Sequence, residues 1–213
     1  MIDPKWVKRC IDLVVSALAL LVLSPLLAVL AIAIRWKLGS PILFTQTRQG
    51  YKARPFTIYK FRTMTDARGP DGRLLPDAKR LTRFGRFLRA SSLDELPELV
   101  NVLKGDMSLV GPRPLILAYV DRYSPEQARR MDVVPGLTGL AQVSGRNALT
   151  WDDRFALDVA YVDGWSLGLD LRILLRTLGA VLGRHGISAE GHATMPEFMG
   201  AHPQRQEGHH GTS

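Results

Sequence analysis

The organisation of this chain is decided by residues 13–34, which read LVVSALALLVLSPLLAVLAIAI. These 22 residues include no charged side chain, and Leu, Val, Ala and Ile dominate them. As a helix that rises about 1.5 Å per residue, a segment of this length can cross the hydrocarbon core of a bilayer. It is too long for the apolar region of a typical cleaved signal peptide, and no clean cleavage site follows it. We therefore predict a membrane segment.

Ser24 and Pro25 interrupt this segment near its middle. Proline removes a backbone donor and clashes with the carbonyl four residues earlier, so the helix should kink or break there, while the serine hydroxyl can satisfy a freed backbone group. Basic residues mark the cytoplasmic end of a membrane span. Here they flank both ends of the segment, as Lys5, Lys8, Arg9, Arg35 and Lys37. Two topologies stay open, a re-entrant segment and a kinked span.

The composition indicates negatively charged partners. The 213 residues include 28 Lys and Arg against 20 Asp and Glu, which gives a formal charge of +8 and a pI near 10.0. Nucleic acid, anionic lipid and phosphorylated small molecules all carry the opposite charge. The length suits one catalytic unit. The single cysteine, Cys10, excludes an intramolecular disulfide, a redox pair and a zinc site built on several thiolates, and it fits a reducing compartment.

Beyond the membrane segment, the pattern predicts an α+β fold that is mainly helical. Two β-type runs within residues 41–63 predict a small hairpin, and the Gly- and Pro-containing residues 66–79 predict a surface loop. Residues 81–103 read as helical, with arginines recurring every three residues opposite an apolar side, which is typical of an amphipathic helix on a membrane or a core. Further helical patterns follow at about 115–131, 152–164 and 167–182.

Candidate catalytic residues lie in residues 91–99, which read SSLDELPEL. Ser92 followed by Glu95 has the spacing of a capping box, and acids in a first helical turn favour the helix dipole. Pro97 suits a helix capped at Asp94 better than one capped at Ser92, because proline is tolerated in the first turn. Helix capping is one explanation of these acids, and catalysis is the other.

Candidate phosphate-binding cations lie elsewhere in the chain. Lys60 and Arg62 stand within YKFRTM at 59–64, and Arg113 lies between two prolines. Such cations on stiff backbone suit a phosphate. We include Arg89 from the arginine stripe, for which a solvated basic face is the alternative. The sequence has no P-loop or Gly-x-Gly-x-x-Gly fingerprint, so a phosphate site has to be built from side chains of this kind.

Asp94 and Glu95 together suit covalent phosphoryl chemistry. A carboxylate can attack a phosphoryl group to form an acyl phosphate when a divalent metal and nearby cations neutralise the oxygens that gain charge. One acid would be nucleophile and metal ligand, and the other would complete the metal shell or position a partner. Oxygen-only ligands favour Mg²⁺, so we expect Mg²⁺ as the cofactor with both acids as ligands.

Five motifs follow one another along the chain: Ser24-Pro25, KFRTM at 60–64, DELP at 94–97, GPRP at 111–114 and PGLTG at 135–139. In this order they closely resemble the monotopic phosphoglycosyl transferases, the family that starts bacterial glycan assembly on undecaprenyl phosphate. The resemblance covers residues 6–198. It implies that the apolar segment is a re-entrant helix in the cytoplasmic leaflet, which agrees with the two basic flanks.

The resemblance also implies a ping-pong reaction. Asp94 would attack the sugar-linked phosphate of a UDP-sugar, expel UMP and carry the phospho-sugar until undecaprenyl phosphate attacks the adduct. Asp94 and Glu95 match the family's pair of catalytic acids, which we call the dyad, with Glu95 as its second member. Lys60 and Arg113 match phosphate-site positions. Asp158 and Asp170 also fall in segments that match the family and join the candidate binding residues. Helix capping or ion pairing is the alternative for these two.

On this basis we divide the chain into a re-entrant helix at 1–38, a cytoplasmic catalytic domain with interface helices at 39–200 and a disordered tail at 201–213. The enzyme should be monotopic, lie on the cytoplasmic face of a bacterial inner membrane and contact anionic lipid. Residues 186–198 resemble the branch that uses UDP-N,N′-diacetylbacillosamine. Within them, His192 either contacts sugar or nucleotide or makes a structural hydrogen bond. The sequence does not fix the oligomeric state.

Two other functions fit parts of the sequence. A membrane-tethered nucleic-acid-binding protein would explain the pI, but the sequence has no recognition motif and no aromatics interleaved with the basic stripe, so we expect no nucleic acid partner. A non-catalytic scaffold could gather anionic lipid through Arg80 to Arg89. The acids would then only cap a helix, and Asp94→Asn would leave activity intact.

Overall fold

The computed structural model describes residues 4–145, 149–182 and 197–200. Its α-helices are α1 (Pro4–Lys37), α2 (Asp77–Arg80), α3 (Arg83–Ala90), α4 (Glu98–Lys104), α5 (Pro125–Ala128), α6 (Leu140–Ser144), α7 (Trp151–Asp163) and α8 (Leu167–Leu182). Its strands are β1 (Leu43–Gln49), β2 (Pro55–Phe61), β3 (Ser108–Val110) and β4 (Gly136–Thr138). Short 3₁₀ turns are η1 (Tyr51–Ala53), η2 (Leu93–Glu95), η3 (Leu117–Arg122) and η4 (Arg129–Met131). The predicted, mainly helical α+β fold is confirmed.

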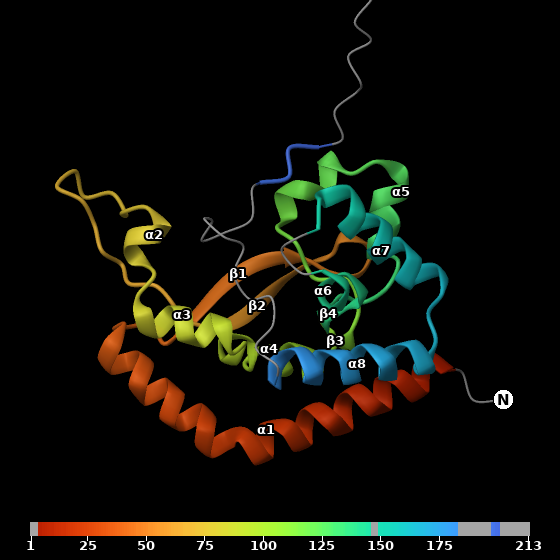
Figure 1. Cartoon of the computed structure of the whole chain (residues 1–213), viewed down its shortest axis with the longest axis horizontal. Helices are drawn as coiled ribbons and strands as arrows, with labels where there is room; N and C mark the ends of the chain where they lie inside the picture. Colours follow the sequence, from red (N-terminus) through yellow and green to blue (C-terminus); the bar gives the residue numbers. More distant parts are fainter. Residues whose placement is uncertain (1–3, 146–148, 183–196, 201–213) are drawn as a thin grey trace, which may run out of the picture.

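Helix α1 is a continuous helix that is bent. Pro25 lies inside it, and the Ser24 hydroxyl donates a hydrogen bond to the Leu21 carbonyl at 2.8 Å. Proline inside a helix is a physical cause of such a bend, because it removes a hydrogen bond and crowds the preceding turn. Figure 1 shows α1 as two arms that meet at an open angle along the lower edge of the molecule, with the rest of the domain above them.

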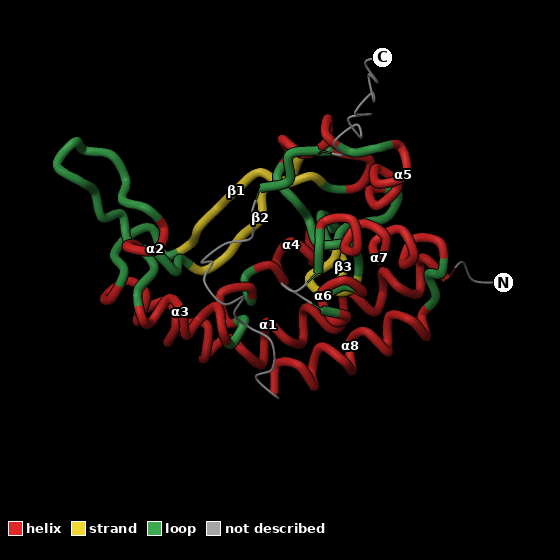
Figure 2. The backbone as a smooth tube through the Cα atoms, turned by 45° about the horizontal axis from the view of Figure 1, so that its top comes forward, coloured by secondary structure: helices red, strands yellow, loops and turns green. Residues whose placement is uncertain are grey.

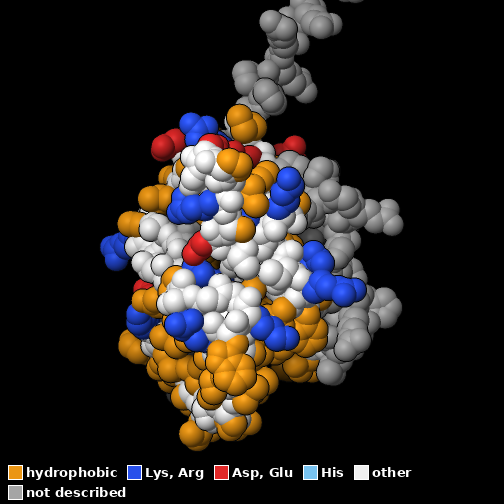
Figure 3. All heavy atoms as spheres, turned by 90° about the vertical axis from the view of Figure 1, so that its left-hand side faces the viewer, with side chains coloured by type: hydrophobic (Ala, Val, Ile, Leu, Met, Phe, Trp, Pro, Cys, Tyr) orange, Lys and Arg blue, Asp and Glu red, His pale blue; other side chains and the backbone are white. Residues whose placement is uncertain are grey.

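Most of the apolar surface of α1 is not used inside the protein. It is the one helix in the described ranges that is long and apolar enough to cross a membrane, and only 11% of its apolar window is buried. Figure 3 shows apolar side chains covering the lower end of the molecule, with Lys and Arg side chains in a band above them. The predicted membrane segment is thus an exposed apolar helix, and its topology, re-entrant or spanning, stays a prediction.

Two small sheets organise the domain above α1. Strands β1 and β2 form the predicted antiparallel hairpin, with Leu43 opposite Phe61 and Gln49 opposite Pro55. Figure 2 shows this hairpin running from the loop beside α2 toward the side of α5. Strands β3 and β4 pair in parallel at Ser108–Gly136 and Val110–Thr138, a contact that the sequence did not predict.

Two of the predicted helical stretches are interrupted. Residues 81–103 form α3, the turn η2 and α4, because Ser92 adopts a left-handed conformation with φ +54° that ends the first helix. Residues 115–131 form η3, α5 and η4. There Tyr123 and Ser124 are extended, as expected for residues just before Pro125. The predictions for 152–164 and 167–182 are confirmed by α7 and α8.

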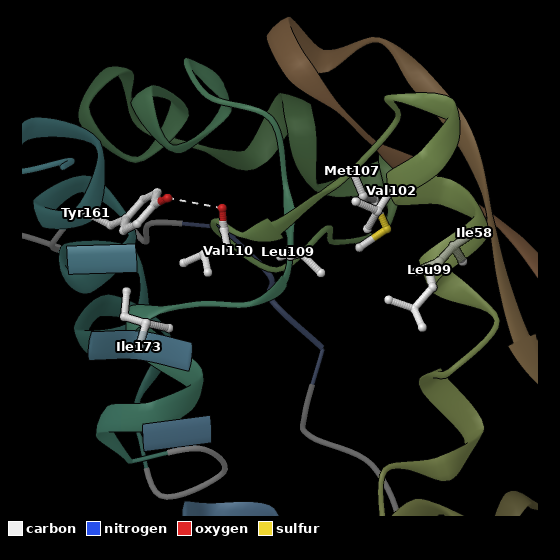
Figure 4. Packing of buried hydrophobic residues seen from close by; sticks show 8 residues of the cluster. All are labelled: Ile58, Leu99, Val102, Met107, Leu109, Val110, Tyr161 and Ile173. Carbon is white, nitrogen blue, oxygen red and sulfur yellow. Dashed lines mark hydrogen bonds between the residues drawn. The ribbon is translucent and has the colours of Figure 1, made fainter. Parts of the chain in front are cut away.

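The central core joins the hairpin to the helices. In Figure 4, side chains from β2, α4, the turn before β3, β3, α7 and α8 form one buried cluster: Ile58, Leu99, Val102, Met107, Leu109, Val110, Tyr161 and Ile173. The hydroxyl of Tyr161 lies 3.1 Å from the Val110 carbonyl oxygen and shares its one proton between this carbonyl and the carboxylate of Asp170. This packing fixes α4 against β2 and β3, and the first residues of α4 lie directly after the candidate catalytic acids.

Polar side chains fasten the first arm of α1 to this core. Arg9 donates to the carbonyls of Val102 and Leu103, at 2.6 and 3.0 Å, at the carboxyl end of α4. The buried carboxylate of Asp12 accepts a hydrogen bond from the Leu109 backbone amide at 3.0 Å. Such bonds satisfy polar groups that would be costly to bury alone. The first arm of α1 is therefore part of the folded domain.

Candidate active site

The two candidate catalytic acids lie in the turn η2, between α3 and α4. Asp94 and Glu95 are inside this turn, and within the described residues neither Ser92 before it nor Pro97 before α4 makes a side-chain capping bond. The helix-capping explanation of these acids is therefore wrong. The left-handed Ser92 redirects the chain so that the turn faces β2 and the loop after β3, where the candidate cations lie.

Glu95 is held by two cations. Its Oε1 accepts hydrogen bonds from Lys60 Nζ at 2.8 Å and from Arg113 Nη2. Burial alone would raise the pKa of Glu95, but the charges of Arg113 and Lys60 outweigh burial and hold this pKa below its usual range. Glu95 in turn raises the pKa of Arg113. Glu95 is thus a fixed anion that positions both cations, as expected for a supporting member of a dyad.

Asp94 has the opposite environment. It is 8% exposed, and its carboxylate makes no hydrogen bond or ion pair within residues 4–145, 149–182 and 197–200. Burial, and then the charge of Glu95, raise its pKa to about 6, against the opposing charges of Lys60, Arg113 and Arg89. A carboxylate that is desolvated and unengaged is free to act as a nucleophile or to accept a cation.

Arg89 belongs to this site and Arg62 does not. Gly85 lets α3 pack closely on the backbone that follows β2, because a Cβ at this position would be 1.8 Å from the Thr63 carbonyl oxygen. Arg89, one turn further on, donates from Nε to Thr63 Oγ1 at 3.0 Å and acts on the charge of Asp94. Arg62 instead pairs with Asp66 at 2.9 Å and donates to the backbone at the end of α1.

Asp158 lies one layer behind the site. It forms an ion pair with Arg130 at 2.8 Å, and both side chains are only 2% exposed. Arg130 Nη2 also donates to the Arg113 carbonyl at 2.7 Å. Asp158 therefore positions the backbone of Arg113 through Arg130, which matches the ion-pairing alternative for this residue.

Asp170 lies outside the site. Its carboxylate accepts hydrogen bonds from Lys8 of α1 at 2.6 Å, from the Tyr161 hydroxyl at 2.7 Å and from Trp165 Nε1 at 3.2 Å. These partners tie α1 to α7 and α8. The ion-pairing alternative therefore describes Asp170 as well.

The buried pair behind Arg113 gives a stability prediction. We expect Asp158→Asn to destabilise the protein by about 3 kcal/mol, because it leaves the buried Arg130 charge without its anion. The melting temperature in a fixed detergent measures the loss. Asp163→Asn is the matched control on the same helix, since its pair with Arg129 is exposed and worth at most about 1 kcal/mol. Equal melting temperatures for the two variants would contradict the assignment.

Three residues without a role in the sequence analysis lie at or beside the site in the structure. Glu98 is almost fully buried, with Oε1 3.0 Å from Lys60 Nζ, and burial raises its pKa. Arg48 shares a small pocket with Lys60, Glu98 and Arg113. Arg130 supports Arg113 from behind. Glu98 could have been found, because it lies in the candidate stretch four residues after Asp94. Arg48 could not, because hydrophobic patterns in the sequence do not reveal the hairpin register that brings it to the site.

The site provides oxygen ligands but not a complete metal shell. Among the described residues, no three His, Cys, Asp or Glu side chains converge as a metal site. The free carboxylate of Asp94 and the adjacent Glu95 still fit Mg²⁺, which is commonly bound by one or two carboxylates together with substrate phosphates and water.

Some predictions concern parts of the chain outside the described residues. These are the tail at 201–213 and most of residues 186–198, including His192. Of the latter segment, Phe198 is described. It is buried against Tyr119, Tyr123, Trp151 and Phe155.

Comparison with known proteins agrees with the motifs. The family model described as bacterial sugar transferase matches residues 4–184. The uncharacterized sugar transferase EpsL of Bacillus subtilis is 51% identical over 194 residues, covering 91% of this chain and 96% of that protein. The UDP-glucose:undecaprenyl-phosphate glucose-1-phosphate transferase of Caulobacter vibrioides is 48% identical over 185 residues, covering 82% of this chain and 69% of that protein.

A longer relative shows the same similarity over part of its length. The undecaprenyl-phosphate galactose phosphotransferase of Salmonella typhimurium is 40% identical over 199 residues, which is 85% of this chain but 42% of that protein. The resemblance drawn from the five motifs is thereby confirmed. The chain belongs to the bacterial sugar transferase family, the bacterial phosphoglycosyl transferases.

Proposed function

We propose that this protein transfers a phospho-sugar from a UDP-sugar to undecaprenyl phosphate through a covalent adduct on Asp94. The observation that carries the proposal is the contrast within the dyad. Asp94 is buried and unengaged, whereas Glu95 is locked between Lys60 and Arg113. The names of two relatives supply the substrate classes, a UDP-linked sugar and undecaprenyl phosphate.

In the first half-reaction, an oxygen of Asp94 attacks the sugar-linked phosphorus of the donor. The bond between this phosphorus and the bridging oxygen breaks, and the oxygen leaves with its electron pair on UMP. Lys60, Arg89 and Arg113, whose charges act on Asp94, neutralise the phosphoryl oxygens as negative charge builds on them. Glu95 keeps two of these cations in place.

In the second half-reaction, a phosphate oxygen of undecaprenyl phosphate attacks the same phosphorus. The bond from phosphorus to Asp94 breaks, which frees the carboxylate for another cycle. Mg²⁺ held by Asp94 and Glu95 would polarise the phosphoryl oxygens and offset their charge. The donor is proposed at the level of a UDP-sugar, with UDP-N,N′-diacetylbacillosamine as the first one to test because of the resemblance at residues 186–198.

The acceptor is a lipid, so the site has to lie at a membrane. We propose that α1 enters the cytoplasmic leaflet of a bacterial inner membrane and returns to the same side. Both of its ends contact one domain, since Arg9 bonds to α4 while Leu30, Ile34 and Leu38 pack with Phe61 and Leu88. A domain lies on one side of a bilayer, and a helix with both ends on that domain fits a re-entrant topology better than a span. The basic band above the apolar surface suits anionic lipid headgroups.

The test is to trap the adduct. The intact mass of the wild-type protein, incubated with UDP-sugar and Mg²⁺ alone, should rise by one phospho-sugar, and peptide mapping should locate it on Asp94. One UMP should be released per adduct, and EDTA should prevent both. A panel of UDP-N,N′-diacetylbacillosamine, UDP-glucose and UDP-galactose identifies the donor. Release of UDP or free sugar, or turnover without any adduct, would show that the proposal is wrong.

A further inference from the structure

A second cationic position lies beside the dyad. Arg48, Lys60 and Arg113 line one narrow pocket together with Ile58, Glu98 and Pro114, and the space between them holds about one phosphate oxygen or water molecule. Lys60 already lies 3.0 Å from Glu98, and Glu95 pairs with both Lys60 and Arg113, so two acids stand against the three cations and one positive charge is left in excess. The pocket therefore favours an anionic oxygen.

Arg48 is only partly satisfied by its protein contacts. Its Nη2 donates to Gln46 Oε1 at 2.6 Å, and Nη1 is 3.5 Å from the Pro114 carbonyl, at the limit of a hydrogen bond. Its Nε is buried and has no hydrogen-bond partner in the described part of the protein. Burial and the nearby charge of Arg113 lower the pKa of Arg48. An anion between the two guanidinium groups would relieve both effects.

The hairpin register shows on which side of Asp94 this pocket lies. Lys60 pairs with Phe44 near the start of the hairpin, beside the residues that pack on α1, whereas Arg48 lies four residues further along β1. Phe44, Gln46 and Arg48 face the same way, because strand side chains alternate. The pocket therefore extends from Lys60, the partner of Glu95, along the hairpin away from the end that packs on α1. We expect a water-soluble nucleotide to enter from that side.

Different cations act at Asp94 and at the pocket beside Arg48. The cations whose charges lower the pKa of Asp94 are Lys60, Arg113 and Arg89, whereas Arg48 interacts with the charges of Arg113 and Glu98. Arg113 is shared by both positions. A pyrophosphate carries two adjacent phosphates, and two cationic positions with a shared cation between them suit such a group.

We propose that Arg48 binds the nucleotide-side phosphate of the donor, beside Arg113, while the sugar-linked phosphate lies at Asp94. This inference rests on the proposed function. When the bond from the sugar-linked phosphorus to the bridging oxygen breaks, negative charge appears on the departing nucleoside monophosphate, and Arg48 stabilises that charge. Arg48 thus serves the first half-reaction, and the second half-reaction proceeds without it.

The test separates the two half-reactions in Arg48→Met. Adduct formation from UDP-sugar, followed by intact mass and UMP release, should slow roughly tenfold to a hundredfold, and Arg48→Lys should recover part of the rate. Once the adduct has accumulated, its decay on addition of undecaprenyl phosphate should change less than about twofold. Lys52→Ala, which removes an exposed cation from the turn of the same hairpin, is the matched control and should change neither rate.

Other outcomes overturn the inference. An unchanged rate of adduct formation would show that Arg48 does not contact the donor. Equal slowing of both half-reactions, with a lower melting temperature, would make Arg48 a structural residue of the hairpin. UMP binding to the resting protein, measured by calorimetry, is a readout independent of catalysis and should weaken in Arg48→Met. If the wild type bound UMP but formed no adduct, the proposed function would fail while the assignment of Arg48 would still be decided by this binding.

Discussion

Asp94→Asn is expected to lower the rate of UMP release at least about a thousandfold and to abolish the adduct. An amide is not a useful nucleophile, and removal of the attacking group leaves only the contribution of binding and charge. Chromatographic detection of UMP and intact mass measure the two effects. Asp121→Asn, which neutralises an exposed acid far along the chain, should retain the wild-type rate. Full turnover by the Asp94 variant would instead favour the non-catalytic scaffold.

The same substitution should make the metal-free protein more stable at neutral pH. The pKa of Asp94 is raised from 3.8 to about 6, so the folded state binds more protons than the unfolded state between these values. Stability therefore falls as the pH rises through this interval, and above pH 6 the full penalty is at most about 3 kcal/mol. Asn carries no such penalty.

Melting temperatures in EDTA check this pH dependence. Asp94→Asn should melt several degrees above the wild type at pH 7.5, and the difference should shrink as the pH is lowered toward 4. A difference that did not depend on pH would show that the charge of Asp94 is not the cause. The carboxylate of Asp94 would then not be a source of instability in the folded protein.

Arg113→Ala should have the second largest effect, lowering the rate of adduct formation roughly a hundredfold to a thousandfold. The charge of Arg113 acts on Asp94, and Arg113 donates a hydrogen bond to Glu95. Its loss therefore removes a cation that would bind the phosphate and one of the two hydrogen-bond donors to Glu95. Single-turnover release of UMP measures the effect. Arg113→Lys should recover only part of it, because an ammonium group cannot reproduce the planar guanidinium contacts. Arg73→Ala, in an exposed loop, is the charge-matched control.

A double variant separates the two roles of Arg113. In Arg113→Ala, Glu95 keeps Lys60 as its remaining partner and becomes a poorly compensated buried charge. Adding Glu95→Gln removes that charge. If the rate stays low, the loss comes from the missing phosphate contact. Recovery to near the wild-type rate would show that Arg113 acts mainly by neutralising Glu95.

The parts of the fold that the sequence predicted correctly depend on local patterns. The apolar run of α1, the hairpin around Gln49 and the helices α7 and α8 are each specified by neighbouring residues. The interruption at Ser92 was missed because a serine gives no local signal of a left-handed conformation, and the turn is stabilised by contacts from β2 and the loop after β3.

The candidate site was predicted in its centre but not in its surroundings. The acids of residues 91–99 and the cations on stiff backbone indicated Asp94, Glu95, Lys60 and Arg113, and the resemblance to the family supported them. The structure brings these four residues together. Asp170 was a candidate binding residue, but in the structure it pairs with Lys8 of α1 outside the site. Lys8 is 162 residues away in the sequence. Pairings over such distances follow from how the elements pack, and one sequence carries no direct record of them.

The polar attachment of α1 also limits how this enzyme can be handled. A truncated form that starts after the anchor would lose Lys8, Arg9 and Asp12, which bond to Asp170, to the end of α4 and to β3. The carboxyl end of α4 would lose its partner Arg9, and the buried Asp170 would lose its counter-ion Lys8. We therefore expect removal of α1 to destabilise the remaining domain, so the intact chain in detergent or nanodiscs is the form to use in assays and inhibitor screening.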